Sequence, residues 1–199
     1  MPTANPPCIT NGGNTMKPKV LIGITGGIAA YKAAEVVSQL VKADCDVRVV
    51  MTDAGTRFVA PLTFAALTRQ KVVTSIFPDT GSGEDDVIYP HLYPATEADA
   101  FAVVPATANA IAKLAHGLGD DIVSCSALSL KSNCKRIFCP AMNVQMWEQP
   151  VVVENARRLL EMGWHQIGPE KGRLACGTYG FGRMSTPTVI AQIILNSVF

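Results

Sequence analysis

The chain has 199 residues, a formal net charge of +1, 48% hydrophobic and 17% charged residues. That length allows one domain with a sizeable core, and the apolar composition favours a buried α/β sheet with subunit interfaces. It contains no dense Lys/Arg run and no apolar stretch of about 20 residues, so nucleic acid and membranes are poor candidates as main partners.

The N-terminal segment and the cysteines bear on the cellular setting. Residues 1–16 are rich in Pro, Asn, Gly and Thr and lack the basic and apolar regions of a signal peptide, so we expect a disordered leader followed by one domain at 17–199. The six cysteines form no CxxC pair and no regular ligand spacing. We therefore predict no metal site and expect reduced thiols in a cytoplasmic protein.

The first predicted elements form a βαβ unit. Val20–Thr25 is an apolar run that ends at Gly26-Gly27, a helical pattern covers Ile28–Lys42, and Asp46–Met51 is a second strand. This order implies a parallel sheet with a right-handed crossover.

The remaining elements continue the alternation of strands and helices. Helices are expected over Pro61–Thr68, Ala108–Ala115, Ile122–Leu130, Val151–Met162 and Pro187–Val198, and strands over Ala100–Val104, Arg136–Cys139 and Trp164–Ile167. Pro105 and Pro140 are expected to close two strands, and Gly163 to follow a helix as its C′ residue. Asp79–Tyr89 is predicted to be a polar loop, and Gly168–Thr186 a long glycine-rich segment.

Three predicted strands end in turns of small residues: Gly26-Gly27, Pro105–Asn109 and Pro140–Asn143. In an open α/β sheet, ligands bind beyond the carboxyl ends of the strands, where these turns would meet. The sequence therefore predicts a three-layer, flavodoxin-like or Rossmann-like parallel sheet in a single domain, with a ligand site at this edge.

Each turn also has a purely structural interpretation. Gly26-Gly27 fits neither dinucleotide nor NTP motifs, so a phosphate at the helix N-terminus and a simple tight turn are equally favoured. Thr52 offers a hydroxyl to a phosphate or ribityl group; Phe58 could cover a flat ring, although core packing is favoured for it. Thr107 and Asn109 could be helix caps, but two polar residues in one small-residue turn favour ligand contact.

Three residues carry the chemical prediction. Asn143 stands in Pro140-Ala-Met-Asn-Val-Gln-Met-Trp147 and is a candidate for a chemical role. The structural alternative is that it only caps a helix. Cys176 stands in a glycine-rich stretch near Arg173 and Arg183, which favours a reactive thiol on a mobile flap. His91 is a catalytic candidate only because Asn143 and Cys176 are also present, while His116 and His165 are expected to be structural.

At these residues the chain resembles the homo-oligomeric flavin-containing cysteine decarboxylases. Pro140–Trp147 matches the Pro-x-Met-Asn-x-x-Met-Trp signature, and Pro105–Ala110 is similar to the family's Pro-Ala-Ser-Ala-Asn-Thr loop, with Thr107 for Ser and Ala110 for Thr. His91 stands where the family has its active-site histidine, and Cys176 matches the cysteine of the substrate clamp. The resemblance covers roughly 17–198.

The resemblance implies an FMN-dependent reaction on a small molecule in coenzyme A biosynthesis. The thiol of 4′-phosphopantothenoylcysteine would be oxidised to a thioaldehyde, CO₂ lost, and the enethiol reduced to 4′-phosphopantetheine. It also implies a homotrimer or dodecamer with sites shared between subunits, a clamp at about 168–186, and in some members a synthetase domain or partner. Arg173 and Arg183 are expected to face substrate phosphate or another chain rather than the thiol, because a proton donor must keep its proton.

The implied site is divided among three groups of residues. The catalytic residues are His91 and Cys176. The substrate-binding residues are Asn143, Met146, Arg173 and Ala175. The cofactor-binding residues are Gly26, Gly27, Ile28, Thr52, Phe58, Pro105, Thr107, Ala108, Asn109, Ala110, Ala141 and Met142.

Three rival functions remain open. A peptidyl-cysteine oxidative decarboxylase would stop at the enethiol and lack the clamp cysteine, so Cys176 argues against it. A flavin prenyltransferase would lack the Met-Asn-x-x-Met-Trp motif. A non-enzymatic regulatory paralogue often lacks one of His91, Asn143 and Cys176, and all three are present here.

Overall fold

The computed structural model describes residues 16–78 and 89–199. The expected leader, apart from Met16, and the expected polar loop, apart from Tyr89, lie outside the described residues. The strands are β1 (Lys19–Ile24), β2 (Asp46–Met51), β3 (Ala100–Ala106), β4 (Lys135–Pro140), β5 (His165–Gln166), β6 (Glu170–Arg173) and β7 (Tyr179–Arg183). The helices are α1 (Ala30–Lys42), α2 (Asp53–Thr56), α3 (Pro61–Thr68), η1 (Ala95–Glu97), α4 (Ala108–His116), α5 (Ile122–Leu128), α6 (Val144–Trp147), α7 (Pro150–Glu161) and α8 (Pro187–Val198).

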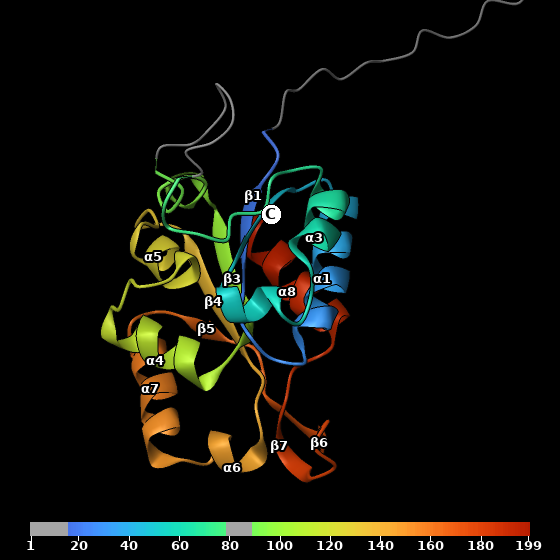
Figure 1. Ribbon diagram of the computed structural model, residues 1–199, viewed down its shortest axis with the longest axis vertical. Coiled ribbons are helices and arrows are strands. Elements are labelled where there is room, and N and C mark those ends of the chain that lie inside the picture. Colours follow the sequence, from blue (N-terminus) through green and yellow to red (C-terminus); the bar gives the residue numbers. More distant parts are fainter. Residues whose placement is uncertain (1–15, 79–88) are drawn as a thin grey trace, which may run out of the picture.

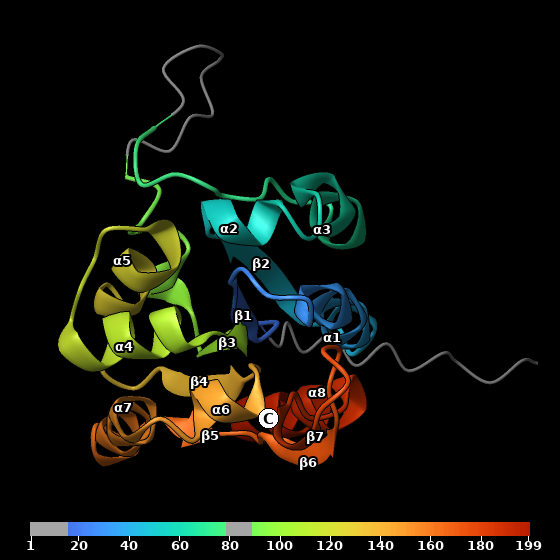
Figure 2. The ribbon, with the colours of Figure 1, turned by 60° about the horizontal axis from the view of Figure 1, so that its bottom comes forward.

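Five parallel strands form a central sheet in the order β2-β1-β3-β4-β5. Helices α1, α3 and α8 cover one face, and α4, α5 and α7 cover the other (Figures 1 and 2). This is the flavodoxin-like strand order, in which the chain changes direction between β1 and β3. The predicted three-layer α/β fold is confirmed.

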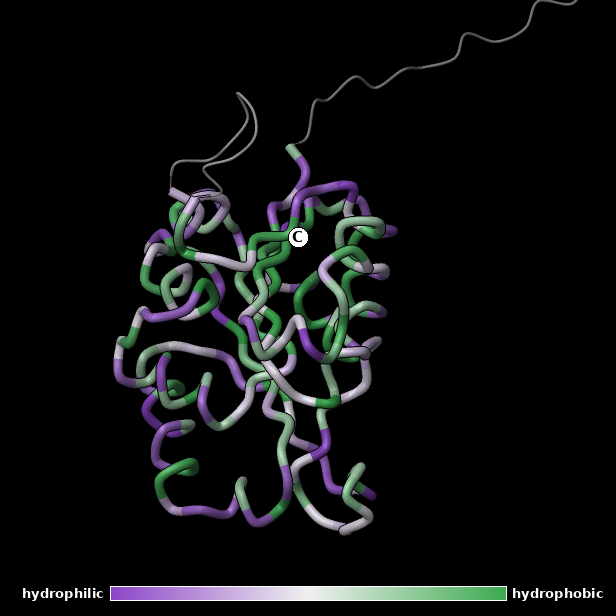
Figure 3. Tube along the Cα trace, viewed as in Figure 1, coloured by the Kyte–Doolittle hydropathy of each residue, from purple (hydrophilic) through white to green (hydrophobic). Residues whose placement is uncertain are grey.

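The apolar runs of the central strands fill two cores. Successive side chains of a strand point to opposite faces, so Ile22 and Val104 join the core under α1 and α8, whereas Leu21 and Phe101 join the core under α4, α5 and α7. Because helices cover both faces, β1 and β3 are apolar at nearly every position rather than at alternate ones (Figure 3).

Most predicted elements are confirmed, and the end of β3 differs from the expectation. Helices α3 and α8 have the expected bounds, and Gly163 follows α7 with a φ of +84°. The expectation that Pro105 closes a strand is wrong, because β3 runs through it to Ala106, whereas β4 does end at Pro140. The register of β3 against β4 shifts between Val103 and Ala106, so the missing N–H of Pro105 falls where the ladder is already irregular.

The glycine-rich segment 168–186 contains an antiparallel hairpin, β6–β7, that the sequence did not predict. The glycines of β7 pack against the segment that leads into α6. A Cβ at Gly180 would lie 2.8 Å from Val144 Cγ2, and one at Gly182 would lie 2.3 Å from the Met142 carbonyl oxygen. These glycines thus permit close packing of the hairpin. Among the described residues, no helix is long and apolar enough to cross a membrane.

Candidate active site

A pocket of about 960 Å³ lies beyond the carboxyl ends of the parallel strands. Its walls come from the turns that follow β1, β2, β3 and β4 and from the β6–β7 hairpin. The hairpin and α6 extend from this edge of the sheet (Figure 1). The three small-residue turns therefore meet as expected, with the turn after β2 and the hairpin added.

Most of the predicted site residues line this pocket. They are Gly26, Gly27, Ile28, Thr52, Thr107, Ala108, Asn109, Ala110, Ala141, Met142, Asn143, Met146, Arg173, Ala175 and Cys176. Three others are not among its lining residues: Pro105 is buried, Phe58 is half exposed next to α2, and His91 lies elsewhere. Within one chain, the fold thus gathers most of the residues predicted to bind cofactor and substrate, together with Cys176 but without His91.

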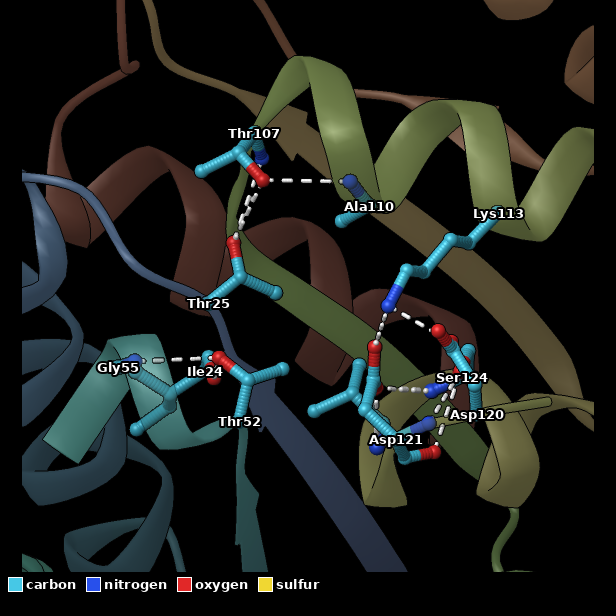
Figure 4. A network of polar contacts seen from close by, with 11 residues as sticks. Ile24, Thr25, Thr52, Gly55, Thr107, Ala110, Lys113, Asp120, Asp121 and Ser124 are labelled. Atoms are coloured by element: carbon cyan, nitrogen blue, oxygen red, sulfur yellow. Dashed lines mark hydrogen bonds and ion pairs between the residues drawn. The ribbon is translucent and has the colours of Figure 1, made fainter. Parts of the chain in front are cut away.

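A buried threonine joins the turns after β1 and β3. Thr25 Oγ1 donates to the Pro105 carbonyl oxygen at 2.7 Å and accepts from the Thr107 backbone N–H at 3.3 Å. Thr107 Oγ1 accepts from the Ala110 N–H at 3.2 Å, so Thr107 is the N-cap of α4 and also lines the pocket (Figure 4). Sequence reasoning did not assign Thr25 to the site; its signal was a hydroxyl at the end of an apolar strand.

The turn after β1 suits a phosphate group. Gly26 is required for packing, because a Cβ there would lie 2.4 Å from Ala54 Cβ. A Cβ at Gly27 would meet nothing closer than Thr107 Cγ2 at 3.7 Å. The N-cap of α1, Ala29, offers no capping side chain, so the first N–H groups of the helix have no side-chain partner. The N–H groups of Ala30 and Lys32 donate to the carbonyl oxygens of Gly27 and Ala29. A helix N-terminus without a capping side chain, beside a roomy pocket, fits the phosphate end of FMN.

The wall formed by α4 and the start of α5 carries an ion-paired cluster that the sequence analysis missed. Lys113 Nζ lies 2.6 Å from Asp120 Oδ1 and 2.7 Å from Asp121 Oδ2 (Figure 4). Burial works against the charge of Lys113, but its hydrogen bonds to Asp120 and Asp121 outweigh burial and raise its pKa. Asp121 also caps α5 in a reciprocal arrangement with Ser124, so the cluster ties α4 to α5.

Asn143 is both a helix cap and a pocket residue. Its Oδ1 accepts from the Gln145 N–H at 2.8 Å, which makes it the N-cap of α6. Its Nδ2 donates to Cys176 Sγ at 3.2 Å. Because the cap uses the amide oxygen, the amide nitrogen is left as the donor toward the pocket.

Cys176 is an exposed thiol with polar neighbours. Its Sγ lies 3.1 Å from Thr178 Oγ1, and hydrogen bonds from Thr178, and then from Asn143, lower its pKa below the ordinary value. Burial has the opposite effect on Cys139, whose pKa is raised. Arg183 pairs with Glu170 at 2.7 Å instead of with the thiol.

His91 lies at the other edge of the sheet. It belongs to the segment 89–99 that leads into β3, where the Asp99 N–H donates to the Lys19 carbonyl oxygen at the start of β1. The seven residues of β3 separate this edge from the pocket by roughly 20 Å. His91 Nδ1 is buried and has no hydrogen-bond partner among the described residues. By contrast, His116 binds Asn155 on α7 at 2.9 Å, which confirms its structural role.

Comparisons with known proteins agree with this geometry. The model of the family described as Flavoprotein matches residues 9–199. A "probable phosphopantothenoylcysteine decarboxylase" of Streptococcus mutans is 38% identical over 179 residues, 90% of this chain and 98% of that protein. The coenzyme A biosynthesis bifunctional protein CoaBC of Bacillus subtilis is 41% identical over 87% of this chain, which spans only 41% of that longer protein.

Solved structures match over nearly the whole chain. A cysteine-to-serine mutant of a PPC decarboxylase, in complex with pantothenoylaminoethenethiol, superposes with a TM-score of 0.77 at 28% identity, covering 90% of this chain and 97% of that one. The FMN binding protein AtHal3 gives a TM-score of 0.75 at 29% identity, covering 90% of this chain and 96% of that one.

Proposed function

The chain belongs to the Flavoprotein family, and on that premise we propose that it is an FMN-dependent decarboxylase of 4′-phosphopantothenoylcysteine, forming 4′-phosphopantetheine for coenzyme A synthesis. The observation that carries the proposal is the contact between Asn143 and Cys176 at the pocket. It places an amide donor and a weakly acidic thiol side by side, next to the turns that suit a flavin phosphate. Residues 17–199 form the catalytic domain, with the clamp at about 168–186.

FMN would be held by the turns after the parallel strands. The turn Gly26, Gly27 and Ile28, which leads into the N-terminus of α1, would receive the phosphate. The apolar walls at Ala108, Ala141 and Met142 would receive the ring. Thr52, Thr107, Asn109 and Ala110 complete this wall; Phe58 and Pro105 stay predictions as cofactor contacts. When bound, FMN supplies the two-electron oxidation of the substrate thiol and the later return of those electrons.

Asn143 would orient the substrate carboxylate. One N–H of its Nδ2 donates to Cys176 Sγ. The second N–H can bind a carboxylate without reorganisation, because the α6 cap holds the side chain in place. Once the thiol carbon is oxidised to a thioaldehyde, the carboxylate lies β to C=S and leaves as CO₂. The remaining electron pair is delocalised on the thioenolate. Met146, Arg173 and Ala175 would contact the rest of the substrate.

Cys176 would give the proton that completes the reduction of the enethiol. Hydrogen bonds from Thr178 and Asn143 stabilise the thiolate that remains, which makes the thiol a better acid. Arg183 is neutralised by Glu170 and does not compete for this role.

His91 would act as acid/base on the substrate thiol from a neighbouring copy. It lies across the sheet from its own pocket, and its Nδ1 has no partner among the described residues. A trimer or dodecamer with shared sites is therefore part of the proposal. The proposal also includes a cytoplasmic setting, which the free thiols of the described cysteines support. A synthetase domain or partner completes it.

The proposal is tested with purified protein, FMN and 4′-phosphopantothenoylcysteine. Cys176→Ser should release CO₂ at the normal rate but accumulate the oxidised enethiol, whereas Cys125→Ser, a thiol on α5 outside the pocket, should yield normal 4′-phosphopantetheine. Normal product from Cys176→Ser would remove the thiol from its role. An enethiol as the final product of the unmodified protein would favour the oxidative decarboxylase, and a protein that stays colourless with added FMN would refute the whole mechanism.

A further inference from the structure

The two polar neighbours of Cys176 differ in what they can do with a proton. Asn143 Nδ2, 3.2 Å from Sγ, can only donate, and its Oδ1 is occupied by the Gln145 N–H. Thr178 Oγ1, 3.1 Å from Sγ on the other side, can donate or accept. A protonated Cys176 that uses both contacts must therefore direct its S–H toward Thr178.

The turn of the hairpin holds Thr178 in this place. The Leu174 N–H donates to the Thr178 carbonyl oxygen at 2.8 Å, and the Gly177 N–H donates to the Leu174 carbonyl oxygen at 2.9 Å. These are backbone contacts, so they survive a change of the Thr178 side chain. Thr178 is exposed, so its hydroxyl can exchange a proton with water.

We propose that Thr178 is a positioning residue that acidifies Cys176 and returns its proton after each turnover. The inference rests on the proposed function. Cys176 gives its Sγ proton to the substrate carbon and is left as a thiolate. Thr178 then passes its hydroxyl proton to Sγ and takes a proton from a water molecule, whose hydroxide is neutralised by the bulk buffer, so Thr178 itself is unchanged.

Among the described residues, the hydrogen bonds of Cys176 Sγ are those with Thr178 and Asn143, and no charged group is among the causes of its lowered pKa. Arg183 is paired with Glu170, and Lys171 Nζ lies over the Tyr179 ring at 5.9 Å from its centroid. Arg173 lines the pocket, as do Lys32, Asp53, Lys113 and Asp121 from the elements that face it. The lowered pKa of Cys176 follows first from Thr178 and then from Asn143, so loss of the Thr178 hydroxyl removes the larger cause.

The first experiment needs no substrate. The alkylation of Cys176 by iodoacetamide is followed across pH by mass spectrometry of its peptide, in the FMN-loaded protein and in Thr178→Val and Thr178→Ser. We expect the Val variant to titrate at higher pH and to react several-fold more slowly at pH 7, and the Ser variant to behave like the unmodified protein. A Val variant that titrates like the unmodified protein would overturn the inference.

The second experiment separates this inference from the proposed function. With 4′-phosphopantothenoylcysteine, Thr178→Val should release CO₂ normally and form 4′-phosphopantetheine several-fold more slowly, with Ser restoring the rate. Thr188→Val, which removes an exposed hydroxyl on α8 outside the pocket, is the control. Normal 4′-phosphopantetheine formation by Thr178→Val contradicts the proton return. Absence of CO₂ release from the unmodified protein contradicts the proposed function while leaving the alkylation result valid.

Discussion

Replacing Gly182 by alanine tests whether the fit of the hairpin against the segment that leads into α6 sets the position of the Cys176 thiol. Gly182 has a φ of +145°, and its carbonyl oxygen accepts from the Met142 N–H at 3.0 Å. An added Cβ would lie 2.3 Å from the Met142 carbonyl oxygen. The Cβ would be fixed on the Cα atom and the Met142 oxygen belongs to the backbone, so no side chain can rotate away to relieve the overlap.

The size of the effect follows from this overlap. The 2.3 Å separation is about 1 Å short of an ordinary contact, and the left-handed φ adds a strain of about 1–3 kcal/mol. The hairpin is a separate two-stranded sheet, so its displacement is the easiest relief and leaves the five-stranded core intact. A misplacement of about 1 Å at a reacting group can cost roughly 100-fold in rate, and we expect a loss of that order in 4′-phosphopantetheine formation.

The assay compares product formation, FMN binding and thermal unfolding in Gly182→Ala and Gly163→Ala. Gly163 also has a positive φ, +84°, but a Cβ there would meet nothing within 4 Å. Gly163→Ala should therefore lower stability by about 1 kcal/mol without loss of activity. Gly182→Ala should bind FMN normally and lose product formation. Wild-type turnover in Gly182→Ala would refute the reasoning that close packing at Met142 sets the position of the thiol.

Two further changes test the site and the electrostatics of the fold. Asn143→Asp keeps the oxygen that caps α6 but removes the amide donor and adds a charge that repels the substrate carboxylate. The rate of CO₂ release should therefore fall by roughly 100-fold or more, while the melting temperature stays unchanged. Normal CO₂ release would contradict the role of the amide. Asp99 is partly buried, which raises its pKa, but hydrogen bonds from Lys131 Nζ at 2.8 Å and the Lys19 N–H at 2.9 Å outweigh burial and lower it. Because the folded pKa of Asp99 is lowered, its carboxylate stabilises the fold above the unfolded pKa near 3.8, and this stabilisation is lost as pH falls through the folded pKa. Asp99→Asn should therefore lower the free energy of unfolding by less than about 1 kcal/mol at pH 7 and should melt like the unmodified protein at acid pH. A difference in melting temperature that persists at acid pH would contradict the role of the Asp99 charge.

The local patterns of the sequence were sufficient for the central sheet. Apolar runs such as Val20–Thr25 and Ala100–Val104 are buried at every position only where helices cover both faces of the strand. The small-residue turns that follow them mark the carboxyl edge of the sheet. The β6–β7 hairpin was missed because glycines at 180 and 182 carry no strand pattern. Glycine is needed at these two positions because the backbone of Met142 and the side chain of Val144, which are distant in the sequence, lie too close for a Cβ atom.

By itself, the sequence determined the fold class, the edge of the sheet where the pocket lies, and the identities of the amide and the thiol, because strand periodicity and short motifs are local properties. Only the tertiary structure decided which of these groups meet. It brought Asn143 within 3.2 Å of Cys176 by packing the hairpin on α6. It placed Thr178 Oγ1 within 3.1 Å of Cys176 Sγ and Lys113 in the wall of the pocket. It also left His91 at the opposite edge of the sheet, since a residue before a parallel strand and a residue after it lie a strand length apart.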